Sequence, residues 1–219
     1  SGEVKTLEIG AAAPDFNLPG VDGKNHTLAE YADADILAVI FLCNHCPSAQ
    51  GAESRVKALI QEYTGKSFQL IAISPNDPQS IRLNELGYSI YSDSLEEMKL
   101  HAAEYEFNFP YLDDGETQSV SLAYGATATP HLFLFDKERK LRYAGRSARR
   151  LGHQRRHKAF GCDRLQCGKL TGWLNQTKTQ KMLQGVIKFA TPGKPRQLAF
   201  TLLAVNQNQQ EPLHPAQVT

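Results

Sequence analysis

The sequence predicts an α/β fold, and two stretches of the chain carry most of that prediction. Residues 36–74 run from a buried apolar strand through an amphipathic helix to a second apolar strand. A crossover of this length implies that the two strands lie parallel and are joined by a right-handed connection. Residues 131–144 place two apolar strands on either side of a short polar turn, which is typical of an antiparallel pair.

Short elements are expected before the first of these stretches. Gly10 to Pro19 contains two prolines and fits an extended edge segment. Asp22-Gly23 is a hairpin turn signal, with a return strand over 25–28. Residues 29–33 are expected to form a short helical turn.

Between the two stretches we expect further helices and a short strand. Ser94 can cap a helix over 94–105, with Glu97 placed three residues later as in a capping box. A short strand is expected over 109–112 and a short helix over 118–124, closed by Gly125. No element is predicted for 79–93.

Charge divides the 219 residues into two unlike parts. Residues 1–146 hold 12 Lys and Arg against 21 Asp and Glu, a net charge of −9, whereas 147–219 hold 12 against 2, a net charge of +10. We therefore expect one domain over 1–146 and a basic, Gln-rich, partly irregular C-terminal extension over 147–219.

The composition argues against a membrane protein and against a disulfide scaffold. No apolar run approaches the roughly 18 residues of a membrane span. No secretory leader is visible, so we expect a cytoplasmic protein, or a periplasmic or exported one if a leader has been removed. Four cysteines in a chain of this length, in the pairs 43/46 and 162/167, indicate chemistry or metal binding.

The pair Cys43 and Cys46 lies where the first buried strand gives way to the helix over 48–63. Backbone N–H groups at a helix N-terminus lack intrahelical partners and carry the positive end of the helix dipole. A thiolate placed there is stabilised, so its pKa falls and the cysteine becomes nucleophilic near neutral pH. The pattern favours a redox-active dithiol over a structural zinc pair or two inert thiols. His45, between the cysteines, would stabilise a thiolate when protonated and so raise the reduction potential.

Residues 8–146 resemble the thioredoxin-like superfamily, and within it the AhpC/TSA (redoxin) type of bacterial thiol–disulfide oxidoreductase. The resemblance rests on motifs that occur in the family's order: Pro14-Asp15-Phe16, Phe41 followed by Cys43-Asn44-His45-Cys46-Pro47, Thr129-Pro130, and Phe133-Leu134-Phe135-Asp136. It implies a central mixed sheet with helices on both faces.

The resemblance also implies roles for the site residues. Cys43 would be the exposed nucleophile and Cys46 the resolving cysteine of a redox-active disulfide. Pro130 would be a cis-proline, with Thr129 and Pro130 binding an extended substrate segment. No cofactor and no metal would be needed; the partners would be protein or small-molecule disulfides and thiols, and a partner reductase.

Two other functions stay open. Redoxin-type peroxidases, which have antioxidant activity, carry Pro-x-x-x-Thr-x-x-Cys, and neither Cys43 nor Cys46 has a threonine and a proline at those distances. A non-catalytic binding protein that keeps the fold is the other alternative. Glu53, seven residues after Cys46, could relay a proton, but a solvated helix face is the more ordinary interpretation.

The C-terminal extension carries weaker signals. His153, His157, Cys162 and Cys167 have the ligand types that zinc prefers, but not the spacing of a standard finger. A basic run that begins at Arg149 has no accompanying nucleic-acid motif, so nucleic-acid binding is not expected.

Overall fold

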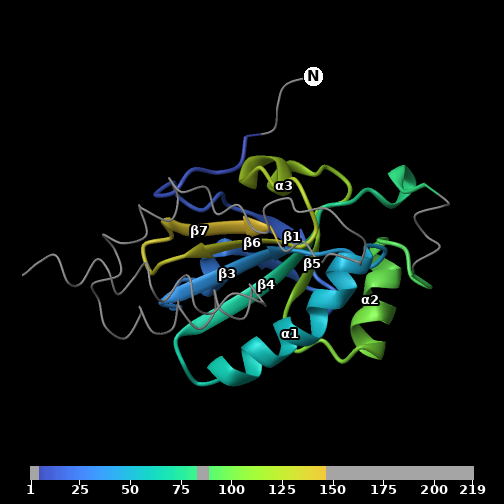
Figure 1. Ribbon diagram of the computed structural model, residues 1–219, viewed down its shortest axis with the longest axis horizontal. Helices are drawn as coiled ribbons and strands as arrows, with labels where there is room; N and C mark the ends of the chain where they lie inside the picture. Colours follow the sequence, from blue (N-terminus) through green and yellow to red (C-terminus); the bar gives the residue numbers. More distant parts are fainter. Residues whose placement is uncertain (1–4, 83–88, 147–219) are drawn as a thin grey trace, which may run out of the picture.

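The computed structural model describes residues 5–82 and 89–146 of the chain, and its centre is a five-stranded mixed sheet (Figure 1). The strand order is β5-β4-β3-β6-β7, with the first three strands parallel and β6 and β7 antiparallel to their neighbours. The strands are β3 (Ile36–Phe41), β4 (Phe68–Ser74), β5 (Tyr111–Asp113), β6 (His131–Phe135) and β7 (Leu141–Arg146). The parallel pair β3–β4 and the antiparallel pair β6–β7 confirm the sequence prediction.

The remaining elements lie around this sheet. A two-stranded antiparallel sheet pairs β1 (Asn17–Pro19) with β2 (Asn25–Thr27). The helices are α1 (Pro47–Tyr63), α2 (Leu95–Glu104) and α3 (Ser119–Tyr124), with 3₁₀ turns η1 (Leu28–Tyr31) and η2 (Pro78–Ser80). Each expected helix is present within one or two residues of its predicted bounds.

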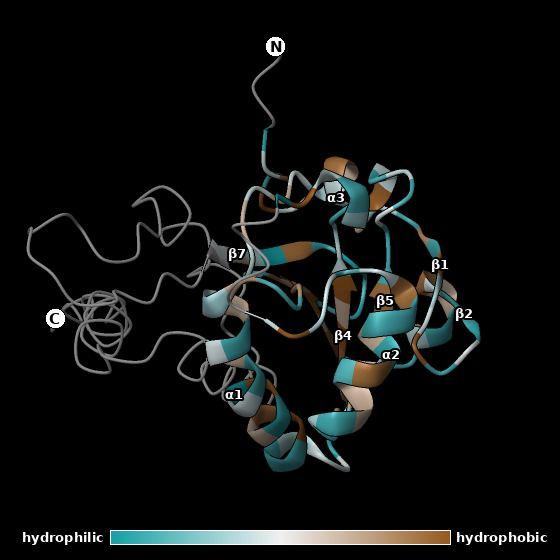
Figure 2. Cartoon of the chain, turned by 90° about the vertical axis from the view of Figure 1, so that its right-hand side faces the viewer, coloured by the Kyte–Doolittle hydropathy of each residue, from teal (hydrophilic) through white to brown (hydrophobic). Residues whose placement is uncertain are grey.

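Two apolar cores form because β3 is buried on both faces. Its six residues alternate: Ile36, Ala38 and Ile40 pack with side chains of α1 and α2, such as Leu59 and Met98. Leu37, Val39 and Phe41 pack on the other face with side chains of α3 and of the N-terminal segment, including Val120, Tyr124 and Phe16. A continuous apolar run is what a central strand covered on both sides requires. Figure 2 shows the same contrast, with apolar strands inside and polar faces on α1 and α2.

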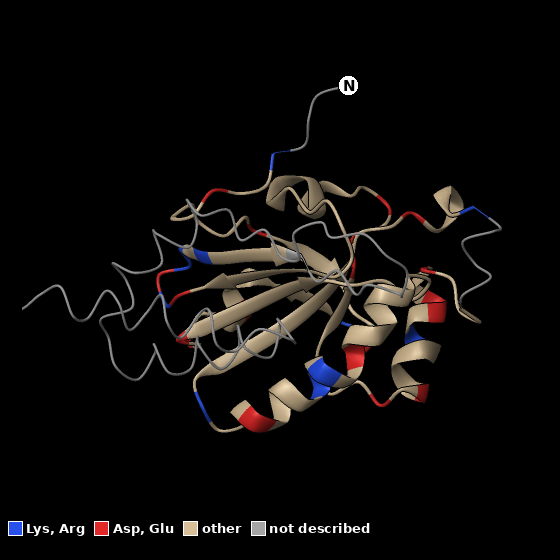
Figure 3. Ribbon diagram, viewed as in Figure 1, with Lys and Arg blue, Asp and Glu red and all other residues tan. Residues whose placement is uncertain are grey.

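Among the described residues, the charged ones lie mostly on the helices and loops, and few lie on the sheet (Figure 3). Within 5–82 and 89–146, no helix is long and apolar enough to cross a membrane. The expectations for the extension over 147–219, including Cys162, Cys167 and the neighbouring histidines, lie outside the described residues.

Candidate active site

The two cysteines of the Cys-x-x-Cys pair occupy different structural positions. Cys43 follows the end of β3 by two residues, whereas Cys46 is the N-cap of α1, in extended conformation. Pro47 stands at the first helical position, where a missing N–H costs nothing and its fixed φ suits the helix. The positive end of the helix therefore lies at Cys46.

Cys46 has the properties of a stabilised thiolate. It is half-buried, and its pKa is lowered to about 5. The largest cause is a hydrogen bond from the Cys43 thiol, and the backbone N–H groups of Ala49 and Ser48 add to it, while burial acts in the opposite direction. These are the orphan donors of the first helical turn, which satisfy an anion at the N-cap.

Cys43 is the opposite case, with only 1% of its surface exposed. Its pKa is raised, because its proton is held by the hydrogen bond to Cys46, because the thiol is buried and because the charge of Asp93 disfavours a second anion. The pair thus shares one proton, with the charge on Cys46. The prediction that Cys43 is the exposed cysteine of the pair is wrong, because the strand end that carries it is covered on both sides.

Thr129 contacts both sulfur atoms from the loop before β6. Its Oγ1 lies 3.1 Å from Cys43 Sγ, and its carbonyl oxygen lies 3.5 Å from Cys46 Sγ. The Thr129–Pro130 peptide bond is cis. The sequence-predicted residues Cys43, Cys46, Thr129 and Pro130 therefore meet at one place, as the resemblance implies.

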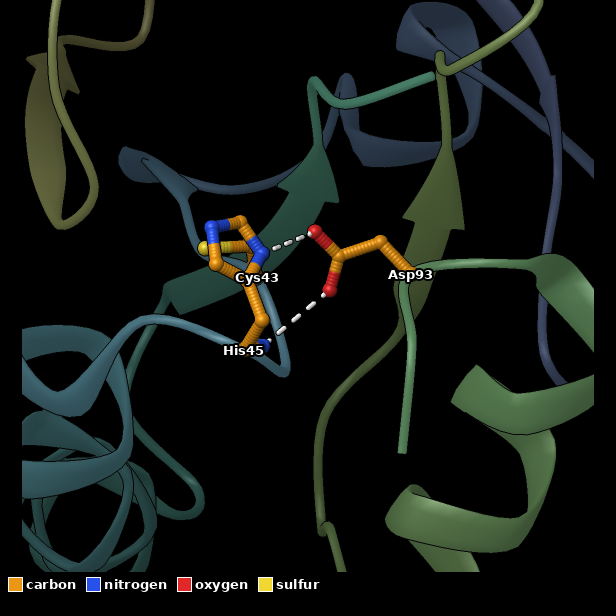
Figure 4. A group of neighbouring side chains, drawn as sticks. All are labelled: Cys43, His45 and Asp93. Carbon is orange, nitrogen blue, oxygen red and sulfur yellow. Dashed lines mark hydrogen bonds and ion pairs between the residues drawn. The ribbon is translucent and has the colours of Figure 1, made fainter. Parts of the chain in front are cut away.

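His45 is oriented by a carboxylate that the sequence analysis missed. Asp93 is fully buried in the loop before α2 and accepts a hydrogen bond from His45 Nδ1 at 2.7 Å (Figure 4). Asp93 also accepts hydrogen bonds from the backbone N–H groups of Asn44 at 2.7 Å and His45 at 3.2 Å, and from the side-chain amide of Asn76 at 2.7 Å. Four donors on one buried carboxylate fix the conformation of the loop between the cysteines.

Asn44 extends this network into the core. Its side chain donates to the Ser92 carbonyl at 2.6 Å and accepts from the Tyr111 hydroxyl at 3.1 Å, and its carbonyl accepts from Gln50 at 2.6 Å. The residue has no exposed surface, and its bonds to Ser92 and Tyr111 join parts of the chain that are far apart in the sequence, whereas the bond from Gln50 ties it to the first turns of α1. The loop that carries the cysteines is therefore rigidly built, as a preorganised site requires.

Cys43, His45 and Asp93 also combine three ligand types that a transition metal accepts. One ligand atom from each lies within 4.8 Å of the other two. Both oxygens of Asp93, however, already accept hydrogen bonds from the loop they hold, so a cation would have to displace those donors. The donor set is better suited to positioning His45 than to holding an ion.

Glu53 corrects another expectation, since it does not lie on a solvated helix face. It is 8% exposed and pairs with the buried His101 of α2 at 2.9 Å. The pair links α1 to α2 and has no contact with either sulfur among the interactions described. Helical periodicity could not place Glu53, because α2 covers a face of α1 that sequence alone leaves to solvent.

The AhpC/TSA family model matches residues 9–144, which is more than half of the chain. The chain belongs to the AhpC/TSA family. Among relatives, it is 24% identical over 140 residues to the thiol-disulfide oxidoreductase ResA of Geobacillus thermodenitrificans, covering 64% of this chain and 70% of that one. Among solved structures, a hypothetical protein of Sinorhizobium meliloti 1021 is 35% identical with a TM-score of 0.59, covering 69% and 78% of the two chains.

A third similarity concerns the fold alone. A putative thiol:disulfide interchange protein DsbE of Chlorobium tepidum is 21% identical with a TM-score of 0.52, covering 64% of this chain and 85% of that one. With the observed sheet and its helices, these matches confirm the thioredoxin-like fold predicted from the sequence.

One signal in the sequence does locate the thiolate of this AhpC/TSA protein. Proline is favoured at the first position of a helix, so Pro47 points to Cys46 as the N-cap. No comparable signal exists for Asp93, which belongs to a segment for which no element was predicted.

Proposed function

We propose that this AhpC/TSA protein is a thiol–disulfide oxidoreductase that works through Cys43-Asn44-His45-Cys46. One observation carries the proposal: a half-exposed thiolate at a helix N-terminus, with a pKa of about 5, accepts a hydrogen bond from a second, buried thiol. A low-pKa thiolate beside a resolving thiol is the arrangement that disulfide exchange needs.

The proposed order of attack reverses the one that the resemblance implies. Cys46 attacks a substrate disulfide, forms a mixed disulfide and releases one thiolate. Cys43 then attacks Cys46 Sγ, the Cys43–Cys46 disulfide closes, and the second substrate thiol leaves. The substrate disulfide gains the electron pair that the dithiol loses, and a partner reductase restores the dithiol. Substrates would be protein or small-molecule disulfides; with the electron flow reversed, they would be thiols.

The remaining predicted residues fit this scheme as binding and tuning groups. Thr129 borders both sulfurs, and together with the cis-bonded Pro130 it would receive an extended segment of the substrate. The low pKa of Cys46 stabilises the dithiol relative to the disulfide, so the pair should be more oxidising than one with an ordinary thiol. His45, which lies between the cysteines, would contribute to that poise.

The test is turnover of insulin or glutathione disulfide by the full chain, with Cys43→Ser and Cys46→Ser variants in a Cys162→Ser/Cys167→Ser background. We expect Cys43→Ser to accumulate a mixed disulfide on Cys46, detected by mass spectrometry, and Cys46→Ser to form none. A mixed disulfide trapped on Cys43 instead would support the original order of attack. No turnover and no trapping would favour a non-catalytic binding protein.

Peroxide reduction is the second candidate, because Cys43 stands three residues before Cys46 and donates to its thiolate. It thus occupies the place of the hydroxyl that peroxidases of this family use. Consumption of hydrogen peroxide with a dithiol donor, faster than insulin reduction, would favour this function over disulfide exchange.

A further inference from the structure

We infer that His45, held by Asp93, accepts the proton of the Cys43 thiol when Cys43 resolves the mixed disulfide. The inference deepens the proposed function and rests on it. It assigns a proton acceptor to the second step and a positioning role to Asp93.

The second step needs a new proton acceptor for Cys43, because the first step consumes the Cys46 thiolate. In the reduced protein, the Cys43 proton is shared with the thiolate of Cys46. Once Cys46 carries a mixed disulfide, that thiolate is gone, yet Cys43 must lose its proton to attack. The thiol is 1% exposed, so bulk water is not at hand, and Thr129 Oγ1 at 3.1 Å can accept a hydrogen bond but not the proton itself.

The imidazole of His45 is the base placed to take it. A ring nitrogen, the Cys43 sulfur and an Asp93 oxygen lie within 4.8 Å of one another, and the sulfur lies beside the ring on the side away from Asp93 (Figure 4). Because Nδ1 donates its hydrogen to Asp93, the neutral ring carries its lone pair on Nε2, which is the ring nitrogen that can accept a proton. This is the logic of a base held in one tautomer by a buried carboxylate.

The step balances in atoms and electrons. The proton moves from Cys43 Sγ to His45 Nε2, and the sulfur's electron pair forms the bond to Cys46 Sγ. The bond between Cys46 and the substrate sulfur breaks, and the leaving thiolate takes its proton from the imidazolium or from solvent.

Replacing Asp93 distinguishes two possible roles of its carboxylate, because they have opposite effects on the attack of Cys43. The ionisable neighbours that act on Cys43 are Cys46 from α1 and Asp93 from the loop before α2, while Tyr111 of β5 senses the charges of Cys43 and Asp93. As a bare charge, Asp93 raises the pKa of Cys43, so removing it should speed the attack of Cys43. If Asp93 acts by orienting His45, removing it should slow the attack of Cys43. The two roles predict opposite signs.

The experiment follows both steps in one trace. Full-length reduced protein in the Cys162→Ser/Cys167→Ser background is mixed with one equivalent of dithiobis-nitrobenzoate, an aromatic disulfide. The first coloured thiolate reports attack by Cys46 and the second reports attack by Cys43. We expect His45→Gln to keep the first phase and to slow the second about 100-fold near neutral pH. We expect Asp93→Asn to slow the second phase as well, and His26→Gln, a matched histidine paired with Asp22, to change neither.

The pH profile separates base catalysis from loop positioning. The second phase should fall with decreasing pH through an imidazole inflection in the parent protein, and His45→Gln should lack that inflection. An unchanged second phase in His45→Gln, or a faster one in Asp93→Asn, would overturn the inference. If Asp93→Asn does not fold, His45→Gln alone decides, because the His45 side chain is partly exposed and its replacement should leave the fold intact. Absence of the first phase in the parent protein would instead refute the proposed function.

Discussion

Replacing Cys43 tests how the thiolate of Cys46 is stabilised. The hydrogen bond from the Cys43 thiol is the largest cause of the low pKa of Cys46, about 5 against an ordinary 9.0. A hydrogen bond to a charged group contributes about 1.5–3 kcal/mol, which corresponds to about 1–2 pKa units. Cys43→Ala should therefore raise the pKa of Cys46 to about 6–7. Cys43→Ser, which keeps a donor, should raise it less.

The pKa should stay below its ordinary value even in Cys43→Ala. The N–H groups of Ser48 and Ala49 remain in place, and so does the helix dipole. The measurement is the pH dependence of alkylation by iodoacetamide, checked by thiolate absorbance, in full-length protein lacking Cys162 and Cys167. Titration of Cys46 near 9 in the parent protein, or equal pKa values in the alanine and serine variants, would refute the reasoning.

Three further predictions follow from the same contacts. The free energy of unfolding of the reduced protein should rise from about pH 5 to about pH 9, because the pKa of Cys46 is lower in the folded state than in the unfolded state. With allowance for solvent screening of a half-exposed group, the gain is about 2–3 kcal/mol. Above pH 9 the raised pKa of Cys43 should reverse the trend, and the oxidised protein should show neither effect. Glu53→Gln should cost about 1–3 kcal/mol in urea unfolding, because it disrupts a buried pair with His101. Thr129→Val should slow the second phase of the aromatic disulfide reaction by a factor of a few, because the hydroxyl orients the Cys43 sulfur.

The control for the buried pair is an exposed one. Glu96 pairs with Lys99 at 2.9 Å on the outer face of α2, and its side chain is 81% exposed. Glu96→Gln should change the free energy of unfolding by less than about 0.5 kcal/mol. If both glutamine variants unfold alike, burial of Glu53 does not contribute what the structure implies.

Local signals in the sequence were sufficient for the strands and α-helices and for most of the site, but not for the 3₁₀ turn η2. The apolar run of β3 predicted a strand covered on both sides, and Ser94 with Glu97 predicted the start of α2, where the Ser94 hydroxyl accepts the Glu97 N–H. The cysteine pair and Thr129-Pro130 were placed together by resemblance, and the structure brings them into contact. These predictions held because each depends on residues within one turn or one strand of one another, or on motifs whose order is characteristic.

Asp93 shows where such reasoning stops. It contacts Asn44 and His45 across 49 and 48 residues, and nothing in the residues beside it marks it as more than a loop carboxylate before a helix cap. Its importance comes from burial together with four donors, and both arise only when the loop before α2 folds over the end of β3. The same tertiary covering buries Cys43 and leaves Cys46 partly exposed at the end of the helix, so packing decides which of the two sulfurs is accessible. A Cys-x-x-Cys spacing brings two sulfurs close together. Which of them carries the charge depends on where the helix begins and on which segments cover the end of the preceding strand.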